Sequence, residues 1–168
     1  AWNLEPRLSP DGAQVLFVSN RDHPTPPNAQ RIYNIYVVNV DGTNLRRLTA
    51  TNDTQSRPTW APDGSRIAFA MQRYNNVDIY SIKADGSDLK RLTTNAAPDF
   101  DPVYRPDGSG IFWARQYNST RARLMHASPD GTHIVEFSPP LTYLQRPVVS
   151  PTGAYLAHEV DIDTDGWL

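Results

Sequence analysis

A repeated proline-aspartate-glycine motif is the feature that most constrains how this chain can fold. Aligning the chain on the glycine of this motif, which is Pro-Thr-Gly in its last copy, gives steps of 52, 44 and 45 residues between Gly12, Gly64, Gly108 and Gly153. A second glycine repeats as Gly42, Gly86 and Gly131. A period in the forties indicates a tandem array of supersecondary units.

The residues around these glycines predict four short strands in each repeat, which we name A to D in chain order. Strand A surrounds a proline that stands six positions before the first glycine, at Pro6, Pro58, Pro102 and Pro147. Strand B follows the motif, with apolar residues three and five positions later, the alternation of a strand with one apolar face. The motifs I-Y and L-x-x-L-T predict strands C and D. Proline, aspartate and glycine favour tight turns, so P-D-G closes the A–B hairpin and D-G the C–D hairpin.

These repeats predict an all-β fold, a segment of a β-propeller with about three and a half four-stranded antiparallel blades. The blades span about residues 2–49, 58–93 and 102–138, and an incomplete blade spans 147–168. A sandwich or a barrel would not require such a period. We expect the residues four positions before the first glycine to pack equivalently between sheets: Leu8, Trp60, Tyr104 and Val149.

Segments such as W-A-P-D-G-S-R-I-A-F-A and D-I-Y-S-I-K-A-D-G-S-D-L-K-R-L-T resemble the WD-like repeat of TolB-type β-propellers. The resemblance covers nearly the whole chain. It implies a non-enzymatic scaffold for protein binding in an extracytoplasmic location, periplasmic or at the cell surface. Similar blades form substrate-gating propellers of prolyl-oligopeptidase-class peptidases and of carbohydrate-active enzymes, which is the alternative function. A lectin-like binder of small molecules is a third possibility.

Composition argues against several classes of partner. The 16 basic and 18 acidic residues give a net charge of −2, so no basic field exists to hold nucleic acid or an anionic membrane. No apolar run approaches the roughly 20 residues that a membrane span needs. The absence of cysteine excludes disulfides, thiol catalysis and cysteine-based zinc sites. We therefore expect no nucleic-acid partner and no membrane insertion.

The sequence also lacks common catalytic motifs. It contains neither G-x-S-x-G nor H-E-x-x-H, and its four histidines are scattered. Asp161, Asp163 and Asp165 precede Gly166 and match the first half of a calcium loop, but a turn between strands B and C explains them as well. An EF-hand would also need flanking helices, which a β array does not supply. We predict no catalytic residue, no cofactor and no metal site.

The residue before each strand-A proline varies in type but is always charged. These residues alternate in sign along the chain: Glu5, Arg57, Asp101 and Arg146. Strand A is the innermost strand of a propeller blade, so we expect these side chains to ring the mouth of the central channel, on the face formed by the D–A and B–C loops. Ion pairing between neighbouring blades and contact with a polar ligand or partner both explain the pattern.

Further binding candidates lie in or near the B–C connections, because recognition residues often sit on loops of a rigid scaffold. The first blade has an insertion of some eight residues there, which is either tolerated length variation or a binding loop. The third blade has three arginines and a tyrosine in its B–C connection. In the last blade, a histidine fills a strand-B position that is aromatic elsewhere. These candidates are His23, Arg31, Tyr33, Arg115, Tyr117 and His158.

The last repeat contains little of strand C and nothing of strand D. A propeller blade buries its two faces against two neighbours, so an open array leaves apolar faces and strand edges uncovered. We therefore expect the terminal blades to be covered by a protein partner, by the remainder of the same propeller or by a second copy in a homo-oligomer.

Overall fold

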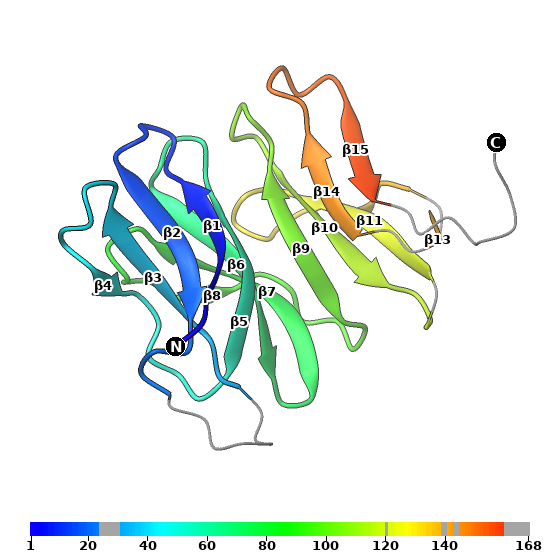
Figure 1. Cartoon of the computed structure of the whole chain (residues 1–168). Helices are drawn as coiled ribbons and strands as arrows, with labels where there is room; N and C mark the ends of the chain where they lie inside the picture. Colours follow the sequence, from blue (N-terminus) through cyan, green and yellow to red (C-terminus); the bar gives the residue numbers. More distant parts are fainter. Residues whose placement is uncertain (24–30, 120, 139–140, 143–144, 160–168) are drawn as a thin grey trace, which may run out of the picture.

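The computed structural model describes residues 1–23, 31–119, 121–138, 141–142 and 145–159. Within these residues the chain forms fifteen strands in four antiparallel sheets and no helix (Figure 1). Each sheet is a meander in which spatial order follows chain order. The prediction of an all-β propeller segment with four-stranded antiparallel blades is confirmed, and the sheets do not close into a ring.

Three of the sheets contain a full set of strands A to D. The first sheet contains β1 (Asn3–Leu8), β2 (Gln14–Ser19), β3 (Asn34–Asn39) and β4 (Arg46–Arg47). The second contains β5 (Thr54–Trp60), β6 (Arg66–Arg73), β7 (Asn76–Lys83) and β8 (Lys90–Arg91). The third contains β9 (Asp99–Tyr104), β10 (Ile111–Gln116), β11 (Arg121–Ala127) and β12 (Val135–Glu136), with β13 (Leu141–Thr142) also paired to β11. The fourth contains β14 (Gln145–Val149) and β15 (Leu156–Glu159).

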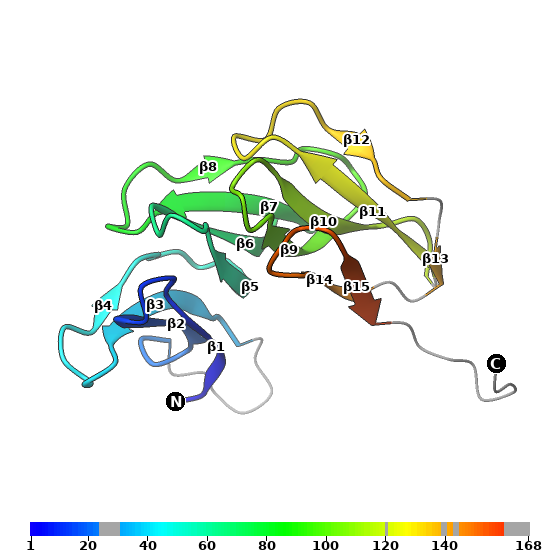
Figure 2. The ribbon, with the colours of Figure 1, turned by 90° about the horizontal axis from the view of Figure 1, so that it is seen from above.

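The sheets stand side by side on an arc, with their first strands on its inner side. Figure 2 shows β1, β5, β9 and β14 toward the middle and β4, β8 and β12 on the outside. Successive first strands contact one another, β1 with β5, β5 with β9, and β9 with β14. The A–B turns emerge at one end of the blades and the B–C connections at the other (Figure 1).

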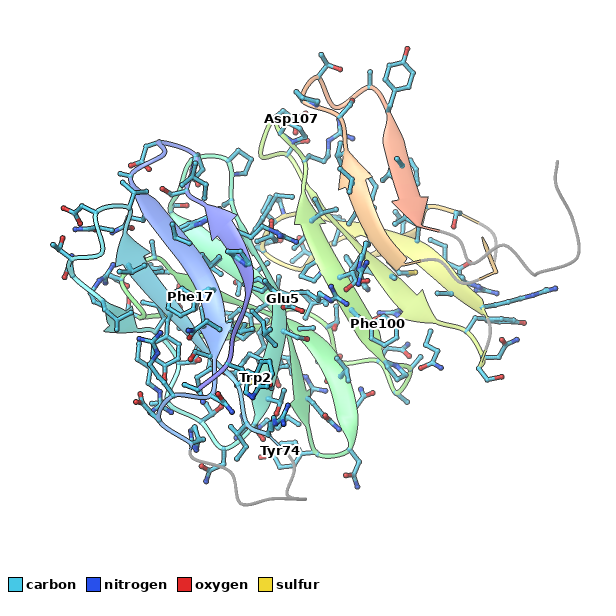
Figure 3. All side chains as sticks on the ribbon, viewed as in Figure 1. Trp2, Glu5, Phe17, Tyr74, Phe100 and Asp107 are labelled. Carbon is cyan, nitrogen blue, oxygen red and sulfur yellow. The ribbon has the colours of Figure 1, made fainter. Side chains whose placement is uncertain are left out.

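Aspartate side chains shape the turns that the repeats predict. At the β9–β10 turn, where Figure 3 shows Asp107, the backbone N–H and the hydroxyl of Ser109 both donate to Asp107 Oδ1, at 3.0 and 2.7 Å. Gly108 between them has a φ of 72°, which glycine adopts at little cost. Hydrogen bonds from Ser109, assisted by Arg105, hold the pKa of the Asp107 carboxyl well below its usual value.

These turns predict that acid destabilises the fold. Hydrogen bonds from a neighbouring residue lower the carboxyl pKa in six turns, at Asp11, Asp41, Asp63, Asp85, Asp107 and Asp130. Because each pKa is lower in the folded than in the unfolded chain, the unfolded chain binds more protons, and stability falls as the pH falls. We expect the urea midpoint to decrease between about pH 5 and about pH 3. A variant with Ser65→Ala, Ser87→Ala and Ser109→Ala should show a shallower decrease, and an unchanged slope would contradict this explanation.

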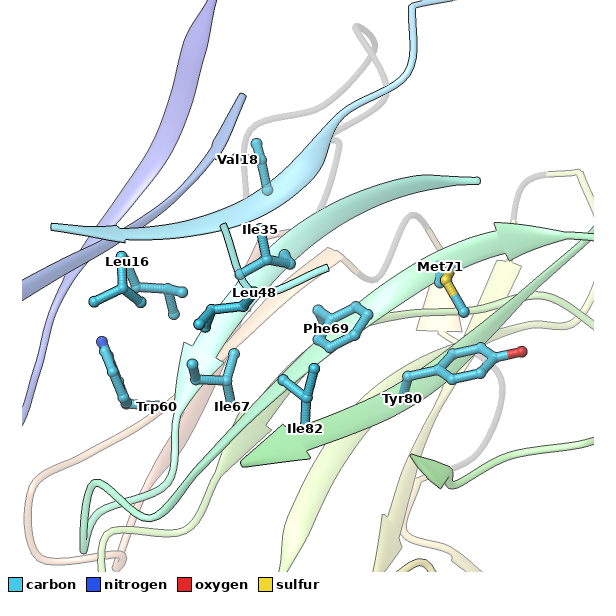
Figure 4. Packing of buried hydrophobic residues seen from close by; sticks show 11 residues of the cluster. Leu16, Val18, Ile35, Leu48, Trp60, Ile67, Phe69, Met71, Tyr80 and Ile82 are labelled. Atoms are coloured by element: carbon cyan, nitrogen blue, oxygen red, sulfur yellow. The ribbon is translucent and has the colours of Figure 1, made fainter. Parts of the chain in front are cut away.

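The core lies between sheets rather than within one. Alternate residues of the first and second sheets pack against each other, and Figure 4 shows the resulting cluster. Its buried members are Leu16, Val18, Ile35, Val37, Leu48, Trp60, Ile67, Phe69, Met71, Tyr80 and Ile82. The opposite side of the second sheet packs in the same way on the third, where Ala68 and Ala70 share a cluster with Trp113. Each central sheet thus buries both of its faces.

The strand-A residue four positions before the glycine faces the preceding sheet. Trp60 is 8% exposed and belongs to the cluster with the first sheet, while Tyr104 is 6% exposed and belongs to the cluster with the second. Val149 packs partly buried against the third sheet. Leu8 is 61% exposed, because the described structure places no sheet on that side of the first. The expected equivalence is therefore correct for three positions and wrong for Leu8.

This difference gives a matched pair of stability predictions. Trp60→Ala should reduce the free energy of unfolding by about 3–5 kcal/mol, because it removes a buried ring between two sheets. Leu8→Ala changes the equivalent position where no sheet lies against it, and should cost no more than about 0.5 kcal/mol. Chemical denaturation of the 168-residue chain measures both. Equal losses for the two variants would show that burial against the neighbouring sheet is not what stabilises this position.

Candidate functional site

The four charged residues before the strand-A prolines share an unusual backbone conformation. Their φ angles are all in the left-handed region: 56° at Glu5, 53° at Arg57, 55° at Asp101 and 46° at Arg146. At each of them the pairing register between strands A and B shifts, as it does at a β-bulge. A bulge removes the residue from the ladder, so that its N–H can bond to another sheet.

The bulges join successive sheets through acid side chains. The carboxylate of Glu5 accepts a hydrogen bond from the backbone N–H of Arg57, and Glu5 Oε1 lies 3.4 Å from Arg57 Nε. Two repeats later, Asp101 Oδ2 accepts the backbone N–H of Arg146 at 2.8 Å, while its Oδ1 lies 3.2 Å from Arg57 Nε. The structure therefore brings these four residues together on the inner side of the arc, where Figure 3 shows Glu5, and their place at the mouth of a channel stays a prediction.

The ring residues differ in how much of them remains accessible. The side chain of Asp101 is 10% exposed, that of Glu5 22% and that of Arg57 33%. Ion pairing between neighbouring blades is what the structure shows for these three residues. Contact of the ring with a ligand or partner stays a prediction, and the arginines offer the more accessible charge for it.

Asp101 should be the more important of the two acids for stability. Asp101→Gly keeps a residue that adopts positive φ freely but removes the acceptor for Arg146 N–H and the partner of Arg57. We expect a loss of about 1–3 kcal/mol in the free energy of unfolding, and a smaller loss for Asp101→Asn, which retains a neutral acceptor. Glu136→Ala, which removes a more exposed ion pair with Arg123, should cost no more than about 0.5 kcal/mol. A loss for Glu136→Ala as large as that for Asp101→Gly would contradict the proposed role of the bulges.

His23 belongs to a hydrogen-bonded group at the base of the first B–C connection. Its Nε2 lies 3.0 Å from Nη2 of Arg47 on β4. Asp22 Oδ2 accepts the Tyr36 hydroxyl at 2.7 Å and lies 3.4 Å from Arg47 Nη1. These contacts attach the start of the insertion to strands C and D of its own blade. Residues 24–30 of the insertion lie outside the described part of the chain.

The other candidates of the first blade have different surroundings. The Arg31 guanidinium lies 5.3 Å from the ring centre of Trp2, which is 56% exposed. The Arg31 carbonyl accepts the Thr54 hydroxyl at 2.9 Å. Tyr33 packs against the first inter-sheet cluster. The loop therefore places Arg31 at the surface and uses Tyr33 in the core.

In the third blade, Arg115 bonds to a buried residue whereas Tyr117 lies at the surface. Arg115 donates two hydrogen bonds to the fully buried carboxylate of Asp99, at 2.7 and 2.9 Å, which makes it part of the internal structure. Tyr117 is 54% exposed, and the Arg123 guanidinium lies 4.5 Å from its ring centre.

The remaining candidates concern the last blade. His158 lies on β15, and its side chain is outside the described part of the structure. The aspartates considered for calcium, Asp161, Asp163 and Asp165, are likewise outside it. Within the described residues, no group of three or more His, Asp or Glu side chains is arranged to hold a metal ion. The same residues include no helix long and apolar enough to cross a bilayer.

Tyr74, like Trp2, is an exposed aromatic residue that was not among the candidates predicted from the sequence. Tyr74 occupies the β6–β7 turn and is 83% exposed, and the Arg73 guanidinium lies 4.9 Å from its ring centre. Tyr74 and Asn75 have φ angles of 51° and 61°, the conformation of a type I′ hairpin turn. Asparagine adopts this conformation readily, whereas tyrosine rarely does. An aromatic residue in a two-residue turn is the sequence signal that could have identified it.

We use the term B–C face for the end of the blades that carries these stacked pairs, at the lower side of Figure 1. Its exposed rings are Trp2, Tyr74 and Tyr117, with the arginines Arg31, Arg73 and Arg123 beside them. Figure 3 shows Trp2 and Tyr74 on this side of the molecule. A shallow groove of about 220 Å³ adjoins Tyr74, lined by Ile32, residues 52–54 and residues 72–75.

Comparisons with known proteins agree with this architecture. The family model for the TolB beta propeller domain matches residues 1–168. Uncharacterized peptidase YuxL of Bacillus subtilis is 35% identical over 65 residues, which are 39% of this chain and 9% of that protein. Tol-Pal system protein TolB of Alcanivorax borkumensis is 29% identical over 70 residues, 42% of this chain and 14% of that protein.

Solved structures extend the likeness over almost the whole chain. The crystal structure of TolB from Acinetobacter baumannii superposes with a TM-score of 0.79 and 18% identity, covering 98% of this chain and 39% of that one. This likeness shows the fold alone. The chain spans a small part of the length of the curated relatives it matches, and those include both a Tol-Pal system protein and a peptidase. Because the family model matches its full length, the chain belongs to the TolB β-propeller domain family.

Proposed function

We propose that this propeller segment is a non-enzymatic scaffold that binds a protein partner through its B–C face. The observation that carries the proposal is the set of exposed aromatic rings with an arginine beside each. Tryptophan, tyrosine and arginine are the residue types most enriched at the energetic centres of protein interfaces. Single exposed rings are common on monomers, but three of them on one face, each with an arginine beside it, favour an interface.

The arginine beside each exposed ring should hold that ring in a fixed orientation. A guanidinium within about 6 Å of a ring centre is attracted to the ring face, so it restricts the ring's orientation. Arg73 is in turn tied to Asp53, with 3.3 Å between Nε and Oδ2. Side chains that are ordered before binding lose less conformational entropy in the complex. The left-handed conformation of Tyr74 adds local strain of the kind that collects at functional sites.

The ring on the inner side of the arc supplies a second set of contacts in this proposal. Glu5, Arg57, Asp101 and Arg146 would contact a polar segment of the partner there, in addition to the ion pairs that join Arg57 to the two acids between sheets. The family resemblance supports an extracytoplasmic location, periplasmic or at the cell surface.

A second function is favoured by the similarity to the peptidase YuxL. In this alternative the propeller gates the substrate of a catalytic domain in the same polypeptide, either a peptidase or a carbohydrate-active enzyme. The B–C face would then contact that catalytic domain rather than a separate protein.

The uncovered side of the first sheet implies a further contact. Leu8 is 61% exposed there. We propose that another sheet covers it, from the remainder of the same propeller or from a second copy in a homo-oligomer, because the equivalent residues Trp60 and Tyr104 face a neighbouring sheet.

Site-specific photo-crosslinking in the source cell tests the proposed function. The full-length protein would carry p-benzoylphenylalanine in place of Tyr74, or in place of Tyr155 as a control. Tyr155 is 78% exposed beside the β14–β15 turn, at the opposite end of the blades. We expect a covalent adduct with a separate protein from position 74 and none from position 155. Trp2→Ala should reduce the yield of the adduct.

The other outcomes of this experiment are informative. An intramolecular adduct that maps to a catalytic domain would support the substrate-gating function instead. Equal labelling from both positions, or no adduct from position 74, would contradict the B–C face as an interface.

A further inference from the structure

A cavity of about 470 Å³ lies between the second and third sheets, at the end of the blades opposite the B–C face. The A–B turns of the two sheets form its sides, through Pro62 and Asp63 on one and Pro106 and Asp107 on the other. Pro129, from the β11–β12 connection, adds a third proline to the wall, and Tyr104 is also part of the lining. The walls are therefore largely apolar, with charged groups among them.

The cavity lies where this pair of sheets differs from the preceding pair. Between the first and second sheets, Trp60 stands where Tyr104 stands here, and its indole N–H donates to the Arg7 carbonyl at 3.4 Å. The turns of that pair lie close together, since Pro10 Cδ is 4.0 Å from the position that a Cβ atom on Gly64 would occupy. No atom lies within 4 Å of the equivalent Cβ position at Gly108. The smaller Tyr104 ring and the separated turns leave the space open.

The hydroxyl of Tyr104 is the first indication of a ligand. The residue is 6% exposed, and its hydroxyl has no hydrogen-bond partner among the described residues. Burial raises the pKa of this hydroxyl to about 12, and the charges of Arg66 and Asp63, both lining the cavity, act on it. An unpaired buried hydroxyl costs stability. Phenylalanine would avoid that cost, so the hydroxyl favours a function.

The charges around the cavity indicate the sign of the ligand. Arg66 is fully engaged, since it donates to Asp88 Oδ2 at 2.8 Å and to the Ser81 hydroxyl. Asp107 lies 3.3 Å from Arg105. Asp63 forms no ion pair among the described residues, and its hydrogen bonds from Ser65 both end on Oδ1. Asp63 is therefore an exposed carboxylate of the cavity that no described cation pairs with.

We propose that this cavity binds the side chain of a lysine or arginine from another polypeptide. The aliphatic stem would lie along the prolines and the Tyr104 ring, as such stems do on apolar surfaces. The cationic group would donate to Asp63 Oδ2 and to the Tyr104 hydroxyl oxygen, which joins the uncompensated charge to the unpaired polar atom. This site is at the other end of the blades from the B–C face and does not depend on the function proposed for that face.

Titration of the 168-residue chain with single-residue probes tests the proposal. The probes are the Nα-acetyl, N-methylamide derivatives of lysine, arginine and norleucine, the last being apolar and uncharged. We expect the backbone amide NMR signals of Ser65, Asp107 and Gly108 to shift with the lysine or arginine probe, with a dissociation constant on the order of millimolar. No response to either cationic probe, or an equal response to norleucine, would overturn the proposal.

Variants separate the contributions. Asp63→Asn keeps an acceptor for the turn and should weaken binding about tenfold. Tyr104→Trp introduces the residue that the second repeat has at this position and should abolish binding by filling the cavity. Asp11→Asn makes the same change in the equivalent turn of the first sheet, away from the cavity, and should leave binding unchanged. If Tyr104→Trp still binds, or if Asp11→Asn weakens binding as much as Asp63→Asn does, the site is elsewhere.

Tyr104→Phe separates a binding role of the hydroxyl from a structural role, because Tm and probe binding are measured on the same variant. It also tests the proposal if Tyr104→Trp does not fold. We expect its Tm to equal or exceed that of the unsubstituted chain, because no partner is lost, while binding of the cationic probe weakens. A lower Tm with unchanged binding would assign the hydroxyl to stability and overturn its role in the site.

Discussion

Face-to-face packing of sheets is the interaction on which the rest of this structure depends. Each sheet is apolar on both sides, so it is stable only between neighbours, and hydrophobic burial scales with the area that both neighbours cover. The two sides of the second sheet are also shaped differently. Phe69 and Met71 fill the space toward the first sheet, whereas Ala68 and Ala70 leave room for the Trp113 ring of the third. Large and small residues alternate across the interface, as close packing requires.

Close packing of the sheet faces brings the first strands of neighbouring sheets together. There, backbone N–H groups also bond from one sheet to the next. The left-handed residue in each strand A removes one N–H from the ladder, and in two of the three sheet-to-sheet joints this N–H meets a carboxylate of the preceding sheet. Such a bond orients neighbouring sheets, while apolar contact alone is not directional. The alternating charges of the inner ring therefore help to fix the positions of neighbouring blades. Arg57 pairs with the acids of the sheets on both of its sides.

Local chemistry explains how much the sequence could predict. The turns depend on aspartate and glycine within a few residues, so the strands and their order could be predicted, as could burial of Trp60. Exposure of Leu8 could not, because it depends on what lies beside the first sheet rather than on the residue. The bulges were also missed, since a residue before proline ordinarily prefers extended conformations. The bidentate contact between Arg115 and Asp99 joins neighbouring strands, and nothing in the repeat marks it.

Departures from the repeat carry more information about function than the repeat does. A residue that recurs in every blade satisfies a need that every blade has, such as closing a turn or filling a space between sheets. Tyr104 meets that need less completely than Trp60, because it leaves both a cavity and an unpaired hydroxyl. Tyr74 places a ring in solvent on a strained turn, where a smaller residue would be more stable. Both choices cost stability in the isolated chain, and binding of a ligand or partner at these two places would offset that cost.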